Sequence, residues 1–371
     1  MSLIDASVPR ILIEAELSPV QGERFQPTGF PDLGPAVYRL PDGTEKLLVE
    51  STQSMANRLE AVCWDEGAAD LVPPLHGLPY VRIDLGPFGV TSSILEFHRL
   101  NSPYIWDLDG DDRRQRFHDA VYAALGVAGR RAVRRGRGRG EAEAEEGPEV
   151  PGVLDARRLA AVCLRYDPNS LVHGVFLEKI AGRLRLPRAL SAFIEATHVA
   201  PAESGGVKFD RVFPEQDRTR GVSSDLGFTN VPFARTEFVA ERITAYFNLD
   251  LALIASHGLP PAGERLVRAL ALWKVRRFLA GGLRLRTACD LECRGVAVSR
   301  PDGAELPAAE ELDEAVRDVI AACRSEGLFA EPPVTEFRTI VPDRGGRGSR
   351  RRDQGGEAEE AQEGESEEDR G

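Results

Sequence analysis

Residues 46–65 constrain the fold more than any other part of this chain, because they have the pattern of a β-strand that runs directly into an α-helix. Residues 47–49 form a short apolar run, and Ser51 or Thr52 can cap a helix by accepting a hydrogen bond from a free backbone N–H group. Apolar residues then recur with helical spacing at Met55, Leu59, Val62 and Cys63. This pattern predicts a helix with one apolar face packed on a β-sheet.

The polar face of the same helix has two interpretations. Ser54, Asn57 and Arg58 share this face, and the first turn contains no acidic residue. Because N–H groups at a helix start carry partial positive charge, a neutral, hydroxyl-rich turn with an arginine one turn later can bind a phosphate. An ordinary solvent-exposed face is the simpler alternative, and the pattern alone favours it since such helices are common.

The composition is that of a globular chain whose charge is unevenly placed. The 371 residues are 42% hydrophobic, which is enough for a core and for one large or two ordinary domains. The net charge is −12, but residues 353–371 hold nine acidic residues and one arginine, so most of that charge lies in the tail. Lysine occurs only four times, and arginine, which suits planar contacts to phosphates and bases, supplies nearly all the positive charge.

The cysteines and the apolar runs argue against several classes of protein. Five scattered cysteines include no CxxC pair, which argues against a zinc site. Together with the lack of a signal peptide, they predict a reducing, cytoplasmic location. The apolar run at 243–254 is interrupted by Asn248 and Asp250 and is too short to span a bilayer.

Hydrophobic periodicity predicts strands and helices along the rest of the chain. Strands are expected at residues 10–20, 80–85, 169–176, 182–196, 236–253 and 283–292. Helices are expected at residues 111–125, 154–166, 263–280 and 308–325. Glycine and proline content predicts a loop at residues 21–35 and a protruding loop or hairpin at residues 200–231.

Two segments have compositions that cannot build a core. Residues 126–152 place six arginines among glycines and then five glutamates, which predicts a disordered Arg-Gly/Glu insertion. Its arginine part can contact nucleic acid without specificity, whereas mutual neutralisation of the two charge blocks favours a solvated loop. The acidic tail, residues 343–371, is also expected to be disordered.

The loop at residues 21–35 is a candidate binding segment. It combines Arg24, Gln26 and Thr28 with two phenylalanines, one of which is Phe30. Exposed aromatic rings can stack on bases while arginine and amide groups hold phosphates. A surface loop pinned by two buried phenylalanine rings fits the same residues equally well.

The segment at residues 182–196 begins with closely spaced arginines. Arg183 and Arg185 alternate with leucines, so a strand here would present two guanidinium groups on one face. Pro187 predicts an edge or a bend just before Arg188.

The sequence contains none of the common enzyme motifs. The chain contains no Walker loop, GxGxxG, GxSxG or HExxH pattern, and its six histidines show no metal-ligand spacing. His98 lies next to Arg99 with no carboxylate or second histidine at motif spacing, which favours a structural role or a phosphate contact over catalysis.

Several long blocks, taken in order, resemble a known family. The blocks are RFQPTGFPDLG at 24–34, LLVESTQSMANRLEAVCWD at 47–65, TSSILEFHRLNSPYI at 91–105, GRLRLPRALSAFIEA at 182–196, NVPFARTEFVAERITAYFNLDLAL at 230–253 and LALWKVRRFLAGGLRLRTACDLE at 270–292. They resemble the CRISPR-associated RAMP superfamily, specifically the Cas-seven type backbone subunit of the type I-U (I-G) Cascade effector complex. The resemblance covers residues 10–292, and ordered blocks are more specific than any short motif.

The resemblance implies an α+β fold, a modified RRM palm with a ferredoxin-like β-α-β-β-α-β core and large inserted thumb and finger elements. The palm with its insertions would span residues 1–342, and the thumb would lie at residues 200–231. The predicted strands contain no clear RNP-type aromatic pair, so base stacking on the sheet is not expected.

The resemblance also implies a role. Several copies would polymerise along one CRISPR RNA, hold its backbone without reading its sequence, and present it for pairing with target DNA. The expected partners are further copies of the chain, a fused Cas-five/Cas-six subunit, a large subunit and a recruited helicase-nuclease. The implied subunit is cytoplasmic and is not an enzyme, and it needs no cofactor, metal or membrane.

Carried over residue by residue, the resemblance implies RNA contacts on the first palm helix, the first loop and several arginine-bearing segments. The set is Arg24, Gln26, Thr28, Phe30, Gln53, Ser54, Asn57, Arg58, His98, Arg99, Arg183, Arg185, Arg188, Lys208, Arg211, Arg235, Arg276 and Arg277. The last three are the weakest members, because arginine at a helix or strand end usually belongs to a solvated face.

A RAMP ribonuclease is the alternative function. It would cleave repeat RNA through a histidine such as His98, or guide-paired target RNA through a thumb aspartate, namely Asp210, Asp217 or Asp225. The type I-like blocks and the lack of an acid–base pair at motif spacing favour the non-catalytic subunit.

Overall fold

The computed structural model describes residues 3–30, 34–126, 155–177, 184–213 and 229–341. The chain divides into two compact units, residues 1–340 and residues 341–371, and the fold below is that of the first. Almost all of the predicted insertion at 126–152 and the whole acidic tail lie outside the described residues.

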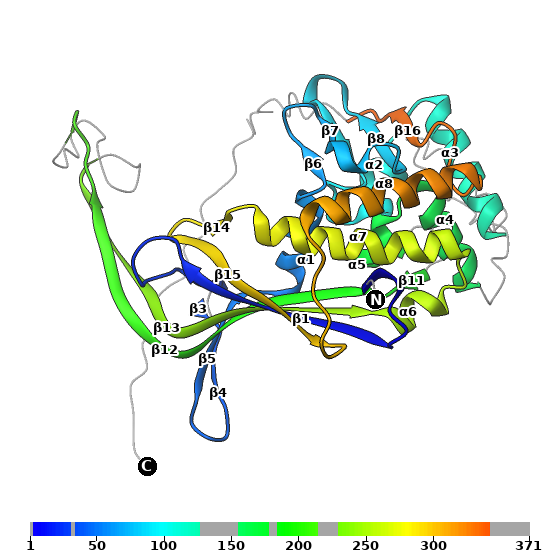
Figure 1. Cartoon of the computed structure of the whole chain (residues 1–371). Helices are drawn as coiled ribbons and strands as arrows, with labels where there is room; N and C mark the ends of the chain where they lie inside the picture. Colours follow the sequence, from blue (N-terminus) through cyan, green and yellow to red (C-terminus); the bar gives the residue numbers. More distant parts are fainter. Residues whose placement is uncertain (1–2, 31–33, 127–154, 178–183, 214–228, 342–371) are drawn as a thin grey trace, which may run out of the picture. The chain divides into compact units, whose positions relative to one another are not determined.

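A seven-stranded antiparallel sheet forms the centre of the first unit (Figure 1). Its strand order is β14-β15-β1-β13-β12-β5-β4, and each neighbouring pair is antiparallel. The strands are β14 (Leu283–Arg286), β15 (Cys289–Arg300), β1 (Arg10–Pro19), β13 (Val231–Asp250), β12 (Leu190–Lys208), β5 (Glu45–Glu50) and β4 (Val37–Arg39).

Long helices cover one face of this sheet. They are α1 (Thr52–Ala61), which packs on β12, α7 (Pro261–Ala280), which packs on β15, and α8 (Ala309–Ser325), which packs on α7 (Figure 1). Burial alternates along β1, where Ile11 and Ile13 are buried and Glu14 is exposed. Such alternation is typical of a strand that is covered on one face.

The remaining elements are shorter. The helices are α2 (Pro103–Trp106), α3 (Asp112–Leu125), α4 (Ala156–Tyr166), α5 (Asn169–His173) and α6 (Leu251–Ser256), with 3-10 turns η1 (Leu3–Asp5), η2 (Pro73–Leu75), η3 (Gly86–Phe88) and η4 (Arg99–Asn101). A three-stranded sheet holds β8 (Tyr80–Asp84) between β9 (Val90–Ser92) and the parallel strand β16 (Val334–Arg338). Two-stranded pairs join β2 (Gly29–Phe30) to β3 (Gly34–Pro35), β6 (Trp64–Asp65) to β7 (Asp70–Leu71), and β10 (Val175–Leu177) to β11 (Leu184–Leu186).

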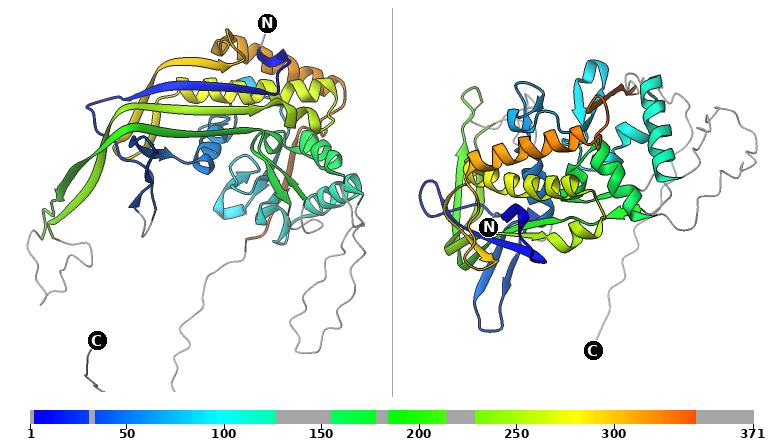
Figure 2. Two further views of the ribbon diagram at one scale, coloured as in Figure 1. Left: turned by 90° about the horizontal axis from the view of Figure 1, so that it is seen from below. Right: turned by 45° about the vertical axis from the view of Figure 1, so that its right-hand side comes forward.

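Strands β12 and β13 continue together beyond the sheet and form a long two-stranded arm (Figures 1 and 2). Their pairing runs from Leu190 opposite Leu249 to Lys208 opposite Val231. We call residues 200–213 and 229–240 the arm. The predicted hairpin is therefore confirmed over the described residues, while residues 214–228 lie outside them.

Most of the predicted elements are confirmed, and several segments differ. The strand predicted at 182–196 is divided into β11 and β12 by a bend at 187–189, and the strand predicted at 236–253 ends at Asp250, where α6 follows. Residues 169–173 form the helix α5 where a strand was predicted, because a five-residue helix is too short to show a helical period. Residues 283–292 form a hairpin rather than one strand, with Ala288 at a left-handed φ of 59° in its turn. The predicted loop at 21–35 contains the short pair β2–β3, and β16 was not predicted.

The structure confirms an α+β fold with mostly antiparallel sheets. Among the described residues, none of the helices combines the length and the apolar character needed to cross a membrane.

Candidate nucleic-acid interface

Helix α1 begins with an arginine beside its first turn. Ser51 Oγ caps the helix by accepting a hydrogen bond from the Ser54 N–H group over 3.3 Å. Arg188, in the bend between β11 and β12, donates to the Thr52 carbonyl oxygen over 2.9 Å and to Gln53 Oε1 over 3.0 Å. The first turn contains no acid, so the guanidinium group and the positive end of the helix dipole act together on an approaching anion.

A groove lies next to this helix start, and we call it the α1 groove. Its volume is about 520 Å³, and it is lined by Gln53, Phe97, His98, Arg99, Asn101, Pro103, Asp107, Val175 and Phe176. Phe97 is 70% exposed. The guanidinium group of Arg185 stacks on the ring of Phe176 at 4.4 Å from its centroid. The groove therefore combines cationic and aromatic side chains, the two kinds that bind single-stranded nucleic acid.

The α1 groove brings together five of the predicted RNA-binding residues from three segments of the chain, and Arg99 is one of them. Gln53 and His98 line it, Arg185 stacks on one of its rings, and Arg188 binds Gln53. His98 is exposed, and within the described part of the chain its ring makes no hydrogen bond or ion pair. It is therefore available to a ligand.

Arg99 belongs to the floor of the α1 groove. It is 7% exposed, and its Nε and Nη2 atoms donate to the two carboxylate oxygens of Glu60 over 2.5 and 2.8 Å. Burial raises the pKa of Glu60, and the adjacent Arg99 guanidinium opposes this shift. Arg99 Nη1 donates to the Gly174 carbonyl oxygen over 3.2 Å. The structure thus gives Arg99 a fixed internal position, and its predicted RNA contact stays a prediction.

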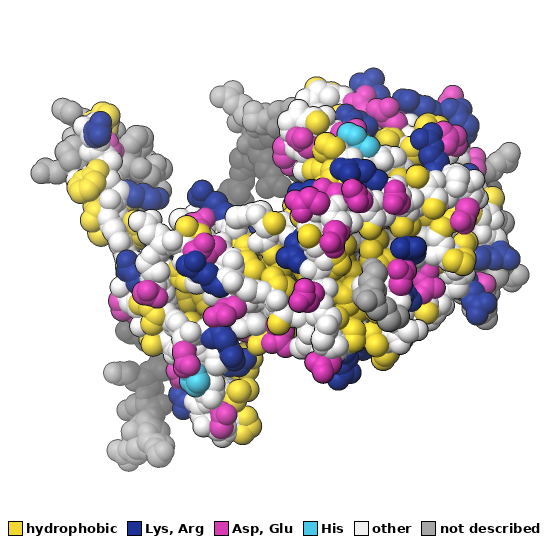
Figure 3. Space-filling view, viewed as in Figure 1, with side chains coloured by type: hydrophobic (Ala, Val, Ile, Leu, Met, Phe, Trp, Pro, Cys, Tyr) yellow, Lys and Arg dark blue, Asp and Glu magenta, His cyan; other side chains and the backbone are white. Residues whose placement is uncertain are grey.

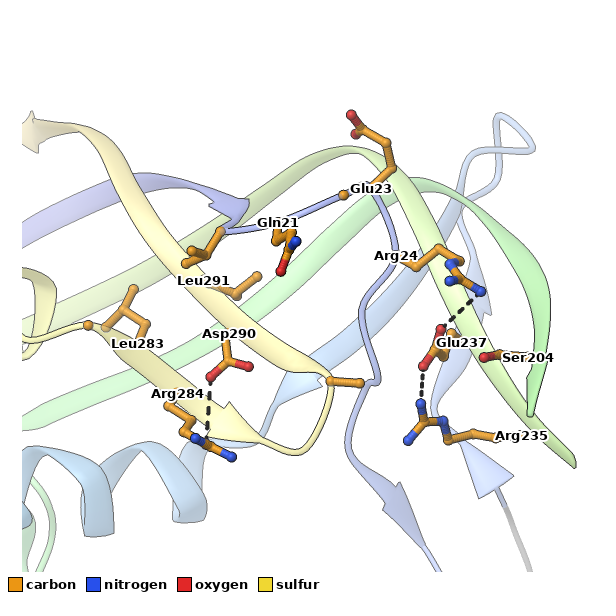
Figure 4. Close-up of a pocket in the computed structure, with 14 residues that line it drawn as sticks. Gln21, Glu23, Arg24, Ser204, Arg235, Glu237, Leu283, Arg284, Asp290 and Leu291 are labelled. Atoms are coloured by element: carbon orange, nitrogen blue, oxygen red, sulfur yellow. Dashed lines mark hydrogen bonds and ion pairs between the residues drawn. The ribbon is translucent and has the colours of Figure 1, made fainter. Parts of the chain in front are cut away.

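A larger cleft lies where the arm leaves the sheet, and we call it the arm-base cleft (Figure 4). Its volume is about 800 Å³, and Arg24, Arg235 and Arg284 line it. Arg24 Nη1 lies 3.6 Å from Glu237 Oε2, and Arg235 also pairs with Glu237. Arg284 Nε lies 3.7 Å from Asp290 Oδ1. Each arginine has an acidic neighbour, so a phosphate entering this cleft would compete with carboxylates.

Ser54 and Arg58 lie in a cluster around the carboxylate of Glu50, which is 1% exposed. Glu50 Oε1 accepts hydrogen bonds from Ser54 Oγ and from Arg58 Nε, the latter over 3.1 Å, and Glu50 Oε2 accepts one from Arg286 Nη2. Arg286 Nη1 donates to the Gln26 carbonyl oxygen over 3.1 Å. The cluster therefore ties α1 and the first loop to the β14–β15 hairpin at the arm-base cleft.

Four other predicted residues of the first loop and of α1 line neither of the two clefts. Asn57 and Gln26 each have a buried side-chain oxygen without a hydrogen-bond partner in the described part of the chain. Thr28 is half-buried, and Phe30 belongs to β2, with its side chain outside the description. Arg183 also lies outside the described residues.

Arg276 and Arg277 of α7 face the segment around α8. Arg276 Nε donates to the Pro307 carbonyl oxygen over 2.8 Å. Arg277 pairs with Asp313, and its guanidinium lies 5.6 Å from the ring centroid of Trp273. These contacts hold α8 on α7, and the weak RNA prediction for both arginines stays untested.

The arm carries two predicted cations together with exposed apolar side chains. Lys208 and Arg211 are exposed, and beside them Phe209 is 81% and Val212 is 75% exposed. Hydrophobic side chains are visible near the end of the arm in the space-filling view (Figure 3). An arm that presents exposed cations beside exposed apolar side chains can contact both nucleic acid and protein.

Asp210, one of the aspartates of the nuclease alternative, closes a turn at the end of the arm. Its Oδ1 accepts hydrogen bonds from the N–H groups of Val212 (2.8 Å) and Phe213 (2.9 Å), and its Oδ2 accepts one from the Thr229 N–H group (2.9 Å). These hydrogen bonds lower the pKa of Asp210. Asp217 and Asp225 lie outside the described residues.

Sequence patterns missed several residues of these sites. Phe97 and Phe176 in the α1 groove have no motif, and Arg284 enters the arm-base cleft only through the unpredicted hairpin. The sheet also carries an aromatic pair that the sequence patterns missed, because Phe193 and Tyr246 lie opposite each other on β12 and β13, while the expectation that bases do not stack on the sheet stays a prediction. Their rings stack at a centroid distance of 5.1 Å. Only strand register, which the sequence does not reveal, could have found this pair.

A cluster of buried titratable groups lies behind α1. Lys274 of α7 is 0% exposed, and its Nζ lies 2.8 Å from His173 Nε2. Burial lowers the pKa of His173 well below its ordinary value, so the neutral ring accepts this hydrogen bond. Asp167 is fully buried, its Oδ2 accepts a hydrogen bond from Ser170 Oγ over 2.8 Å, and burial raises its pKa to about 7. In the described ranges, no set of three or more His, Cys, Asp or Glu side chains is placed to hold a metal ion.

Comparison with known proteins gives one family match. The sequence model of the family described as CRISPR-associated protein GSU0053 matches residues 11–201. A search of curated proteins finds no match.

Two solved structures are similar to this chain at low sequence identity. A protein of a "CRISPR RNA-guided surveillance complex, pre-nicking" is 15% identical, with a TM-score of 0.40, over 86% of this chain and 89% of that chain. Csc2 of Thermofilum pendens is 10% identical, with a TM-score of 0.30, over 88% of this chain and 81% of that chain. At these low TM-scores neither similarity defines the fold.

Proposed function

The chain belongs to the CRISPR-associated protein GSU0053 family, and on this premise we propose that it is a non-catalytic backbone subunit that binds CRISPR RNA in a type I surveillance complex. One observation carries the proposal. Gln53, His98, Arg185 and Arg188 converge from three segments of the chain on one groove beside a helix start, where the exposed ring of Phe97 and the half-buried ring of Phe176 also lie.

The order of the main elements supports an RRM-like palm. In chain order, β1, α1, β12, β13, α7 and β15 follow the pattern β-α-β-β-α-β, and their strands are adjacent in the order β15-β1-β13-β12. In this proposal the other elements are insertions into the palm, and the arm is the thumb. The domain limits expected from the sequence, a palm at 1–342 and a tail at 343–371, belong to the same proposal.

The proposed RNA path begins in the α1 groove. Phosphate groups would be bound by Arg185, Arg188 and the N–H groups of the first turn of α1, with His98 and Gln53 as hydrogen-bonding neighbours. These contacts are directed to the backbone, so binding would not depend on sequence. Arg24 and Arg235 in the arm-base cleft would contact the RNA farther along its path.

The arm supports assembly of several copies along one RNA. Its exposed cations, Lys208 and Arg211, would contact the RNA bound by a neighbouring copy, and Phe209 and Val212 would contact the neighbour's protein surface. The guide would then pair with target DNA. A fused Cas-five/Cas-six subunit, a large subunit, a recruited helicase-nuclease and a cytoplasmic location complete the proposal.

A non-catalytic role is also proposed for the two described residues of the nuclease alternative, RNA contact for His98 and closure of a turn for Asp210. His98 lies in the α1 groove among Gln53 and Phe97, where it would contact RNA. Both carboxylate oxygens of Asp210 are used by backbone N–H groups in the turn of the arm. Incubation of the assembled complex with labelled repeat RNA and with paired target RNA, with and without divalent metal, tests this assignment. Metal-dependent or metal-independent cleavage that disappears in His98→Ala would overturn it.

Purification with the proposed partner subunits and a CRISPR array tests the main proposal. We expect a large complex that protects RNA of guide length and loses it steeply as salt rises. Arg185→Ala should lower RNA affinity, whereas Arg116→Ala, which removes an exposed arginine of α3 outside both clefts, should not. An RNA-free monomer under these conditions, or equal effects of the two substitutions, would contradict the proposal.

A further inference from the structure

We propose that the α1 groove holds one unstacked nucleobase of the bound single-stranded RNA, with its ring against Phe97 and its edge toward Asn101. This inference rests on the proposed function, and it adds a base-binding subsite to what was proposed as backbone recognition.

The exposure of Phe97 is the first observation. An aromatic ring that is 70% exposed inside a groove leaves a large apolar surface in contact with water. Covering that surface with a flat aromatic ligand recovers hydrophobic and stacking free energy, and nucleobases are such ligands. The groove volume of about 520 Å³ lies within the range of about 300–1,000 Å³ that is usual for small-molecule sites.

The second observation is that Phe97 is held between two anchored residues. On one side, the Glu96 carboxylate accepts hydrogen bonds from Thr91 Oγ1 over 2.6 Å and from Ser102 Oγ over 3.1 Å. Two positions after Phe97 along the chain, Arg99 is fixed by its paired contacts to the buried Glu60. The ring is therefore presented by a rigid turn, and binding does not require that turn to become ordered.

The third observation is an unsatisfied amide in the lining of the groove. Asn101 is 9% exposed, and its Oδ1 atom has no hydrogen-bond partner among the described residues. A buried amide oxygen without a partner is costly. Since the orientation of an asparagine amide can be exchanged by a flip, a base edge with both donors and acceptors can satisfy this group.

The polar groups of the groove fit the rest of the nucleotide. The guanidinium group of Arg185 lies over the ring of Phe176, and Arg188 lies at the start of α1. Each of these arginines contacts a residue that lines the groove, so a base on Phe97 can keep its own phosphate near them. A protein side chain entering the groove would not use these arginines in this way, so we favour RNA as the occupant.

Photocrosslinking tests the subsite directly. The full-length protein is bound to single-stranded RNAs that carry 5-iodouridine at successive positions, irradiated, and mapped by mass spectrometry. We expect one crosslinked residue to be Phe97. Phe97→Leu should abolish that crosslink and lower RNA affinity by about 5- to 150-fold, the usual effect of losing one base–aromatic stack. Phe97→Trp should retain a crosslink at position 97 and the RNA affinity of the wild type.

Phe88→Leu is the matched control, because Phe88 is 61% exposed in η3 and does not line the groove. It should leave the crosslink and the affinity unchanged, and equal melting temperatures would exclude misfolding. Two results together would overturn the subsite and leave the proposed function intact. They are an RNA affinity of Phe97→Leu equal to that of the wild type, and no crosslink at Phe97 in the wild type. A wild-type protein that binds no RNA would instead overturn the proposed function. Failure of Phe97→Leu to join partner proteins at unchanged RNA affinity would assign the groove to protein contact and also overturn the subsite.

Discussion

Arg188 Nη1 lies 2.9 Å from the carbonyl oxygen of Thr52, which places a guanidinium group at the N-terminal end of helix α1. The helix dipole disfavours a cation at this end. Burial, with a contribution from the neighbouring Arg99, lowers the pKa of Arg188, and Glu60 is the acidic group that opposes this shift. A bound anion would relieve the remaining positive potential. This is the electrostatic reason to expect a phosphate in the α1 groove.

The first prediction concerns this arginine. Arg188→Gln should lower RNA affinity about tenfold, because it removes one charged phosphate contact. It should also reduce the slope of log K against log[salt] by about 0.7, since one fewer counterion is released from a single strand. Fluorescence anisotropy over a salt series measures both quantities. Arg116→Gln on α3 is the control, and a salt slope that is unchanged in Arg188→Gln would show that Arg188 does not contact phosphate.

The second prediction concerns the Glu50 cluster. Glu50→Gln leaves Arg58 and Arg286 without the carboxylate that neutralises them, and Glu50 is buried while both arginines are half-buried. We expect the free energy of unfolding to fall by about 3 kcal/mol, the lower end of the loss for a broken buried ion pair, because both arginines are partly exposed. Denaturant titration measures this change.

Glu45→Gln provides the comparison for this prediction. It breaks the exposed pair with Arg39, so its effect should not exceed about 1 kcal/mol. If the two substitutions cost the same, the Glu50 cluster does not stabilise the junction of β5, α1 and the β14–β15 hairpin.

The parts of the fold that the sequence predicts are those with local signals. The strand β5 and helix α1 follow from an apolar run, the Ser51 cap and the spacing of Met55 and Leu59, all within a few residues. The turn of the β14–β15 hairpin was missed because Ala288 adopts its left-handed φ without the glycine or asparagine that usually marks such a turn.

The candidate site depends on contacts that join distant segments, and these have no local signal. Arg286 reaches Glu50 across 236 positions of the chain, and Arg188 reaches Thr52 across 136. The residue types of the α1 groove could be predicted, since Gln53, His98 and Arg188 were candidates. Their convergence, and the presence of Phe97 beside them, required the tertiary structure.

The third prediction concerns the pH dependence of stability. The pKa of Asp167 is about 7 in the folded chain because of burial, and it is about 3.9 when unfolded. Between these values the folded state binds the proton more tightly, so the contribution of Asp167 to stability is complete below about pH 4 and is lost as pH rises to about 7. Asp167→Asn should remove this loss and should reduce the slope of the unfolding free energy by up to about 1.4 kcal/mol per pH unit.

Denaturant titrations of both proteins between pH 4 and 8 measure this slope. His173 acts in the opposite direction, because its lowered pKa costs stability as pH falls below its unfolded value. It is present in both proteins, as are Glu60, Arg99 and Lys274 around Asp167, so the difference between the two curves isolates Asp167. Parallel curves would show that Asp167 is ionised to the same extent in the folded and unfolded states.

The fourth prediction concerns the arm. Phe209 and Val212 are among the most exposed apolar side chains of the described residues, so replacing both with serine removes little packing among those residues. The free energy of unfolding should change by less than about 0.5 kcal/mol, as is usual for surface substitutions. If the arm contacts a neighbouring copy, however, the double variant should place fewer copies on one RNA, because an apolar contact between subunits is lost.

Mass photometry of the complex on a long RNA counts the copies. Phe88→Ser is the control, since Phe88 is 61% exposed and lies away from the arm in η3. Equal copy numbers for the arm variant, the control and the wild type would mean that Phe209 and Val212 do not join subunits. A fall in copy number together with an unchanged affinity of a single copy for a short RNA would separate the two functions. The arm would then serve assembly, while the α1 groove serves RNA binding within one subunit.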